Sequence, residues 1–303
     1  MRGAALLAAL LVAALVLGGC SVIVNGRAVS GNGVMTRPVD TGIVRGSDGG
    51  PVDELSTATL LDVQSYWRAT FEPAFGRPWR DISGGFFSVD TSDPQAPPPP
   101  CLEASVQLEG NAFYCAGADA VAWDRAALLP VLREQYGDGG VVVVLAHEVG
   151  HAVHHRLGVD PSSMRGGRSV YPMILTEAMA DCYAGSFVRW VADGNAEHLR
   201  LDQQELYRAL SAQLTFRDPV GTSSGDTEAH GNAFDRVSAF QDGYQQGPQL
   251  CMNFTVDNRK FTQQRFTSYE DRALEGNLPF NRLLSVISPD LDKYYGNLVT
   301  TMG

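Results

Sequence analysis

The chain has 303 residues, of which 44% are hydrophobic and 19% charged, and its 23 basic and 34 acidic residues give a formal net charge of -11. The apolar fraction supports a sizeable core, which excludes wholesale disorder, and the basic residues are scattered, which excludes a nucleic-acid-binding surface. The five cysteines are an odd number, so a set of disulfides leaves at least one of them for another use.

The first twenty residues are typical of an export signal. Arg2 is followed by small and apolar residues up to Leu17, a run too short to cross a bilayer core of about 30 Å as a helix. The next residues, Gly18-Gly19-Cys20, complete a resemblance to the bacterial lipobox, whose cysteine is diacylated and becomes the mature N-terminus. We therefore predict a signal peptide at 1–19 and a lipid anchor on Cys20, at the outer face of a bacterial cell membrane. The alternative is an ordinary exported protein with an incidental cysteine.

The segment after the lipobox, 20–52, is predicted to be a lipid-anchored flexible tether, because it is rich in Gly, Asn, Ser and Thr and has no sustained apolar period. One domain is expected over 53–303. It starts with a helical pattern, which precedes a short strand at 86–89 and a hairpin at 111–124.

Helical patterns dominate the rest of the chain. They are predicted at 125–136, 141–157, 174–191, 202–214, 232–246 and 282–287. A small early sheet followed by helices predicts an α+β fold that is mostly helical.

The predicted helix 141–157 contains the motif H-E-x-x-H at His147, Glu148 and His151. Residues four apart lie on one face of a helix, about 6 Å apart along its axis, so both imidazoles can reach one divalent ion. The carboxylate of Glu148 can then take a proton from a metal-activated water without binding the metal. The motif predicts one catalytic Zn²⁺ ion, the alternative being that these side chains lie on a solvated helix face.

A catalytic zinc site takes three protein ligands and leaves the fourth position for water. The extended motif with a third histidine is absent, because Leu157 stands at that position. Downstream, Glu177 and Asp181 lie four apart on an otherwise apolar helix, where burying acids is costly unless they are paired or bound to metal. We predict that Glu177 is the third ligand and that Asp181 accepts the second ring N–H of a ligand histidine, most simply His147.

The stretch LAHEVGHAVHHRLG, followed by TEAMADCYAG and HGNAFDRVSAFQDGYQQG, is similar to the bacterial family of neutral zinc metallopeptidases. The resemblance covers roughly Asn111 to Cys251, and the lipobox points towards actinobacterial lipoprotein members of the family. It implies a zincin fold with His147, His151 and Glu177 as zinc ligands and Glu148 as base, in agreement with the assignment from the residues themselves.

Three further histidines lie near these motifs. His230 matches the family's His-Gly pair, and a histidine or arginine outside the ligand set often polarises the developing oxyanion in such hydrolases. We predict this catalytic role for His230, with a structural role at a helix start as the alternative. For His154 and His155 a place in the cleft wall or in solvent is favoured over binding of a second metal.

The four remaining cysteines are expected to be oxidised outside the membrane, which allows three disulfide connectivities. We favour Cys101 with Cys115, closing a short loop around the hairpin, and Cys182 with Cys251. The second bridge would brace the helix that carries Glu177.

These features predict a membrane-anchored zinc peptidase that hydrolyses a peptide or protein substrate, with an extended peptide held by an edge strand near 121–123. The alternatives are a catalytically silent zinc-binding envelope lipoprotein that acts through a partner, or a zinc hydrolase of non-peptide substrates. Intact Glu148 argues against the silent protein, because a closed structural zinc site has no use for a base.

Overall fold

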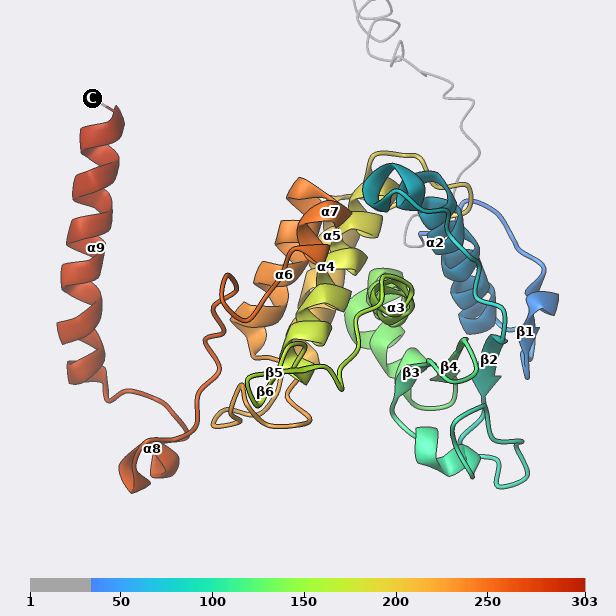
Figure 1. Cartoon of the computed structure of the whole chain (residues 1–303), viewed down its shortest axis with the longest axis horizontal. Coiled ribbons are helices and arrows are strands. Elements are labelled where there is room, and N and C mark those ends of the chain that lie inside the picture. Colours follow the sequence, from blue (N-terminus) through green and yellow to red (C-terminus); the bar gives the residue numbers. More distant parts are fainter. Residues whose placement is uncertain (1–33, 303) are drawn as a thin grey trace, which may run out of the picture. The chain divides into compact units, whose positions relative to one another are not determined.

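The computed structural model describes residues 34–302 (Figure 1), which belong to the second of two units of the chain, Met1–Gly33 and Val34–Gly303. The predicted signal peptide and the predicted lipidated Cys20 lie outside the described residues. Helices dominate the described part and a small sheet precedes most of them, so the predicted α+β fold class is confirmed.

Most predicted helices form within a few residues of their expected bounds. The long helices are α2 (Pro51–Phe75), α3 (Leu128–Arg156), α4 (Met173–Ala192), α5 (Gln203–Thr215), α6 (Ala233–Gln246) and α9 (Phe280–Met302). The shorter ones are α7 (Pro248–Met252), α8 (Tyr269–Ala273) and the 3₁₀ turns η1 (Thr41–Ile43) and η2 (Ser105–Leu108), which the sequence patterns did not reveal.

Local signals set the ends of several helices. α2 begins with Pro51, whose fixed φ suits the first helical position, and ends at Gly76 in the left-handed conformation (φ 70°). The side chains of Asp202 and Asn232 cap α5 and α6 by accepting hydrogen bonds from backbone N–H groups of the first turn.

The helix α3 lies at the centre of the domain and contacts α2, α4, α5 and β3 (Figure 1). Gly137 interrupts it with a φ of 65°, so it consists of two helical segments, as the sequence predicts. The apolar run 141–145 is buried against the surrounding elements, and His147 and Glu148 that follow it are only 7% and 8% exposed. The motif therefore lies inside the domain, and the alternative of a solvated helix face is wrong.

The main sheet has four strands in the order β1 (Val44–Arg45), β2 (Gly85–Val89), β4 (Ala120–Asp124) and β3 (Ala112–Cys115). β3 pairs with β4 as the predicted antiparallel hairpin, whereas β1, β2 and β4 run parallel. The prediction of an edge strand at 121–123 is wrong, because β4 pairs with β2 on one side and β3 on the other, and all of its residues are buried. Among the described strands, β3 is an edge of this sheet. A separate hairpin, β5 (Met164–Arg165) with β6 (Arg168–Ser169), connects α3 to α4.

Part of the predicted tether, 34–52, is ordered. Val34 is buried and its N–H donates to Asp138 Oδ2 over 3.2 Å, Met35 forms a bridge with Leu199, and β1 pairs with β2. The partners lie far away in the sequence, so local composition did not reveal them. The ordered domain therefore begins earlier than predicted.

The C-terminal helix α9 is longer than the predicted 282–287 and continues through Pro289. It carries a row of apolar side chains at intervals of three and four residues, including Leu284, Ile287 and Leu291, and these side chains are exposed. Between residues 34 and 302, none of the helices is both long and apolar enough to cross a membrane.

Helices α4 and α6 pack closely through Gly185 and Gly243. A β-carbon at Gly243 would overlap the backbone carbonyl of Cys182, and one at Gly185 would overlap that of Phe240. Two stretches of backbone thus meet where only glycine fits.

The substitution Gly243→Ala is expected to lower the free energy of unfolding by about 3 kcal/mol, because the backbone of α4 has to move to admit the methyl group. This corresponds to a fall in melting temperature of roughly 6–12 °C, measured by circular dichroism. Gly296→Ala on α9 is the matched control: among the described residues, no atom outside its own helix lies within 4 Å of the added β-carbon, and we expect an unchanged or slightly higher melting temperature. If both variants melt like the wild type, α4 and α6 do not pack as described.

Candidate metal centre

Two crossing helices bring the predicted residues together. α3 carries the H-E-x-x-H motif and α4 carries the two acids. The helices approach closely because Gly150 of the motif faces Ala180: a β-carbon at Gly150 would lie 2.8 Å from the Ala180 carbonyl oxygen. Small residues at the crossing therefore let side chains from both helices converge on one point.

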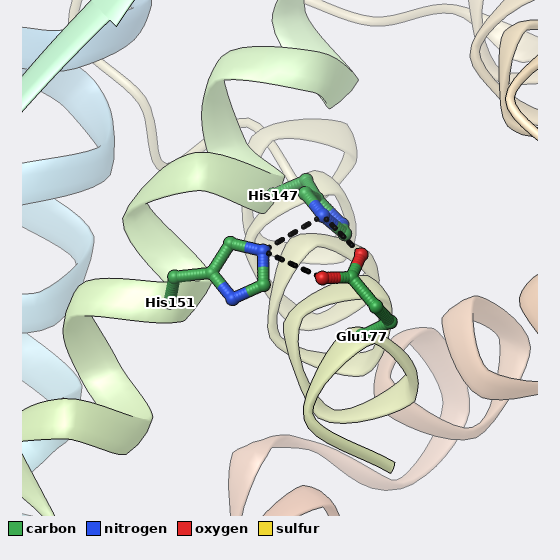
Figure 2. Close-up of side chains that lie close together, drawn as sticks. All are labelled: His147, His151 and Glu177. Carbon is green, nitrogen blue, oxygen red and sulfur yellow. Dashed lines mark hydrogen bonds and ion pairs between the residues drawn. The ribbon is translucent and has the colours of Figure 1, made fainter. Parts of the chain in front are cut away.

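The donor atoms of the three predicted ligands surround a common centre (Figure 2). His147 Nε2 lies 3.1 Å from His151 Nε2 and 3.2 Å from Glu177 Oε2, and His151 Nε2 lies 3.4 Å from Glu177 Oε1. Ligands bound to tetrahedral zinc at about 2.0–2.1 Å lie about 3.3 Å from one another. Two imidazoles and one carboxylate at this spacing therefore fit one zinc ion.

His147 is oriented by a buried polar network. Asp181 Oδ1 lies 2.7 Å from His147 Nδ1. Arg236 holds Asp181 through two hydrogen bonds, from Nε to Oδ2 (2.9 Å) and from Nη2 to Oδ1 (2.8 Å), and Gln213 Nε2 donates to Oδ1 (3.0 Å). Burial favours the neutral acid, but the charges of Arg236 and His147 hold the pKa of Asp181 below its ordinary value. Arg236 and Gln213 lie far along the chain, and no sequence pattern linked them to Asp181.

The two ligand histidines differ in protonation. Burial, together with the charge of His147, lowers the pKa of His151 to about 4 against the opposing effect of Glu177, so the His151 ring is neutral. Burial also lowers the pKa of His147, but the carboxylates of Asp181 and Glu177 outweigh this effect and raise the pKa of His147 to about 10. The two carboxylates thus favour a proton on His147, whereas burial keeps the His151 ring neutral. Burial disfavours the charge of Glu177 too, yet both histidines hold its pKa well below the ordinary value.

A cavity of about 560 Å³ opens beside the three ligands, lined also by Glu148, by the β3 segment 112–114 and by apolar side chains such as Val144 and Phe216. Glu148 lies outside the group of candidate ligands found among the described residues. Burial raises the pKa of Glu148 to about 7, with His147 opposing this shift and Glu177 adding to it. A carboxyl group that faces a cavity and titrates near neutrality can exchange protons with a molecule bound there.

His154 has a contact that sequence reasoning missed. Its Nε2 lies 2.9 Å from Nδ1 of His151, and burial holds the pKa of His154 well below the ordinary value, so the ring is neutral. His151 and His154 lie three residues apart on one helix, and this spacing could have indicated that their side chains meet. His154 lies in the lining of the cavity, which agrees with the place in the cleft wall that the sequence analysis favoured. The neighbouring His155 is exposed, with Nδ1 3.0 Å from the Tyr114 hydroxyl.

His230 lies in the lining of the same cavity with about half of its side chain exposed. Its Nδ1 is 3.4 Å from Asp218 Oδ1, and the N–H groups of His230 and Gly231 donate to Asp218 Oδ2. These contacts fix the backbone before α6. The catalytic role of His230 stays a prediction.

Both favoured disulfides are present, Cys101–Cys115 and Cys182–Cys251. The second bridge joins α4 to α7 directly after Asp181. A covalent link therefore holds the segment of α4 that orients His147.

A family model and several known proteins match parts of this chain. The model of a family described as "Putative neutral zinc metallopeptidase" matches residues 2–254. Uncharacterized proteins of Mycobacterium bovis and Mycobacterium tuberculosis are 29% identical over 217 residues, which is 66% of this chain and 69% of each relative. The uncharacterized protein YpfJ of Escherichia coli K12 is 27% identical over 158 residues, which is 47% of this chain and 53% of that relative. No solved structure matches the chain significantly.

Proposed function

Because the chain belongs to the neutral zinc metallopeptidase family, we propose that it is a zinc-dependent peptidase whose metal ligands are His147, His151 and Glu177. The observation that carries the proposal is the mutual spacing of these three donor groups beside a cavity into which Glu148 also faces. Zinc bound there supplies Lewis-acid activation of a water molecule and of the scissile carbonyl.

Glu148 is the general base and then the general acid of the proposed reaction. Its carboxylate takes a proton from the attacking water and delivers it to the leaving amine. The pKa of about 7, which results mainly from burial, suits both steps because the group changes protonation near neutral pH. The third ligand Glu177 stays ionised and contributes negative charge to the site.

The edge strand β3 is the proposed backbone-binding element for the substrate. Its residues 112–114 line the cavity next to the ligands, and among the described strands it pairs only with β4. An extended peptide can add to such an edge through main-chain hydrogen bonds, which are independent of side-chain identity. This position replaces the internal segment 121–123 that the sequence suggested.

Three protein ligands beside an open cavity favour catalysis over the alternative of a silent zinc-binding protein. A purely structural zinc site is closed by four protein ligands. In the described part of the chain, the candidate ligand group has three members, and the cavity lies next to them.

The proposed location is the outer face of the cell membrane, through a lipid on Cys20. The two disulfides support export, because such bonds persist in oxidising compartments. The wild-type protein should incorporate a radiolabelled fatty acid and Cys20→Ala should not, as followed by gel autoradiography. A wild-type protein that takes up no label would overturn the proposed anchor.

The peptidase proposal is tested by incubating the purified protein with a peptide mixture of defined composition and identifying new termini by mass spectrometry. We expect cleavage products with the zinc-loaded protein and none with a metal-stripped sample. Zinc binding without any cleavage would favour the silent zinc-binding protein, and hydrolysis of ester but not peptide substrates would favour the non-peptide hydrolase.

A further inference from the structure

The two ligand histidines are oriented by partners of different chemistry. The Nδ1 atom of His147 faces the ionised Asp181, whereas the Nδ1 atom of His151 faces the imidazole of His154 at 2.9 Å. The distance between His151 Nδ1 and His154 Nε2 is that of a hydrogen bond, and the two rings are nearly perpendicular (88°). His154 is buried, with 7% of its surface exposed.

The contact fixes where both rings carry their protons. Figure 2 shows one ring nitrogen of His151 turned towards His147 and Glu177 and the other turned away. The nitrogen that binds a metal carries no proton, so the proton of the neutral His151 ring lies on Nδ1. His151 Nδ1–H then donates a hydrogen bond to Nε2 of His154, so the proton of the neutral His154 ring lies on its Nδ1.

This arrangement leaves one polar atom of His154 unsatisfied. Its Nδ1 is buried and has no hydrogen-bond partner among the described residues. A buried donor without a partner destabilises the folded state, so packing alone does not favour histidine here. A carboxylate at this position would add negative charge to a site that already contains Glu148, Glu177 and Asp181. A neutral imidazole orients His151 without adding charge.

We propose that His154 is a positioning residue for the metal site: its Nε2 accepts a hydrogen bond from His151 Nδ1–H and holds the His151 ring with its own Nε2 towards the metal. The inference rests on the proposed zinc site but not on the identity of the substrate. The proposal predicts that His154 raises the affinity for zinc and lowers the stability of the folded, metal-free protein.

The test is zinc affinity, measured by competition with a chromogenic chelator. His154→Phe keeps a ring without nitrogen atoms and should weaken zinc binding about 10- to 100-fold, as is usual when the partner of a ligand histidine is lost. His154→Gln should bind zinc within about threefold of the wild type, because its amide oxygen can accept the hydrogen bond from His151 Nδ1–H. If the Phe variant does not fold, His154→Leu takes its place. The metal-free Phe or Leu variant should melt no lower than the metal-free wild type.

His155→Leu is the matched control, since among the described residues this exposed neighbour hydrogen-bonds Tyr114 and none of the three proposed ligands, and its zinc affinity should equal that of the wild type. The proposal is overturned if the Phe or Leu variant binds zinc as tightly as the wild type, or if the Gln variant binds as weakly as they do. Wild-type protein that binds no zinc would overturn the zinc site itself, whereas zinc binding without peptide cleavage would overturn only the peptidase function.

Discussion

Replacing Glu148 by glutamine is expected to lower kcat for peptide hydrolysis by about 10²- to 10⁴-fold while the protein keeps its zinc, because general acid–base catalysis contributes factors of this size. Glutamine has nearly the shape of glutamate but cannot take a proton from water. The side chain lies in the cavity lining and outside the ligand group, so its replacement leaves the metal ligands in place.

Single-turnover rates and zinc content, measured on the same preparations, check this prediction. Glu228→Gln is the matched control, because this glutamate is exposed and lies outside the residues that line the cavity. A Glu148→Gln protein that cleaves at the wild-type rate would show that another group transfers the proton. A variant that loses zinc together with activity would place Glu148 among the ligands.

Removing the third ligand by Glu177→Ala is expected to weaken zinc binding by more than about 100-fold. Losing only the hydrogen-bond partner of a ligand usually weakens metal binding by about 10- to 100-fold, and losing the ligand itself should weaken it more. Peptide hydrolysis should fall to background at low free zinc. The carboxylate is buried between His147 and His151, and no other carboxylate of the candidate ligand group can replace it.

Chelator competition and residual activity at defined free zinc concentrations measure this effect. Because Glu177 is buried, thermal unfolding of the metal-free variant is needed to show that the protein still folds. A folded variant with wild-type zinc affinity would remove Glu177 from the ligand set and leave the third ligand to be found elsewhere.

The residues that bind the metal in this account could be predicted because their chemistry follows from spacing within single helices. The interval of four between His147 and His151 places both rings on one face, and the acids Glu177 and Asp181 stand out on an apolar helix. Periodicity also placed the long helices and the hairpin, since these patterns depend on local sequence.

The features of the fold and the site that could not be predicted depend on contacts between segments far apart in the sequence. The parallel pairing of β2 with β4 makes β3 the edge strand, and no local pattern encodes strand order. Arg236 meets Asp181 across 55 residues, and the N–H of Val34 donates to the side chain of Asp138 across 104 residues. The contact between His151 and His154 was within reach of helix geometry, but the orientation of two rings is set by packing.

The most direct test of the account is a zinc titration of the metal-stripped wild-type protein, in which bound zinc and the rate of peptide cleavage are measured in the same samples. We predict that both rise together and saturate at about one zinc ion per chain, as expected for one site with three protein ligands. Saturation with zinc while cleavage stays at background, or cleavage by the zinc-free protein, would contradict the proposal that zinc at His147, His151 and Glu177 drives peptide hydrolysis.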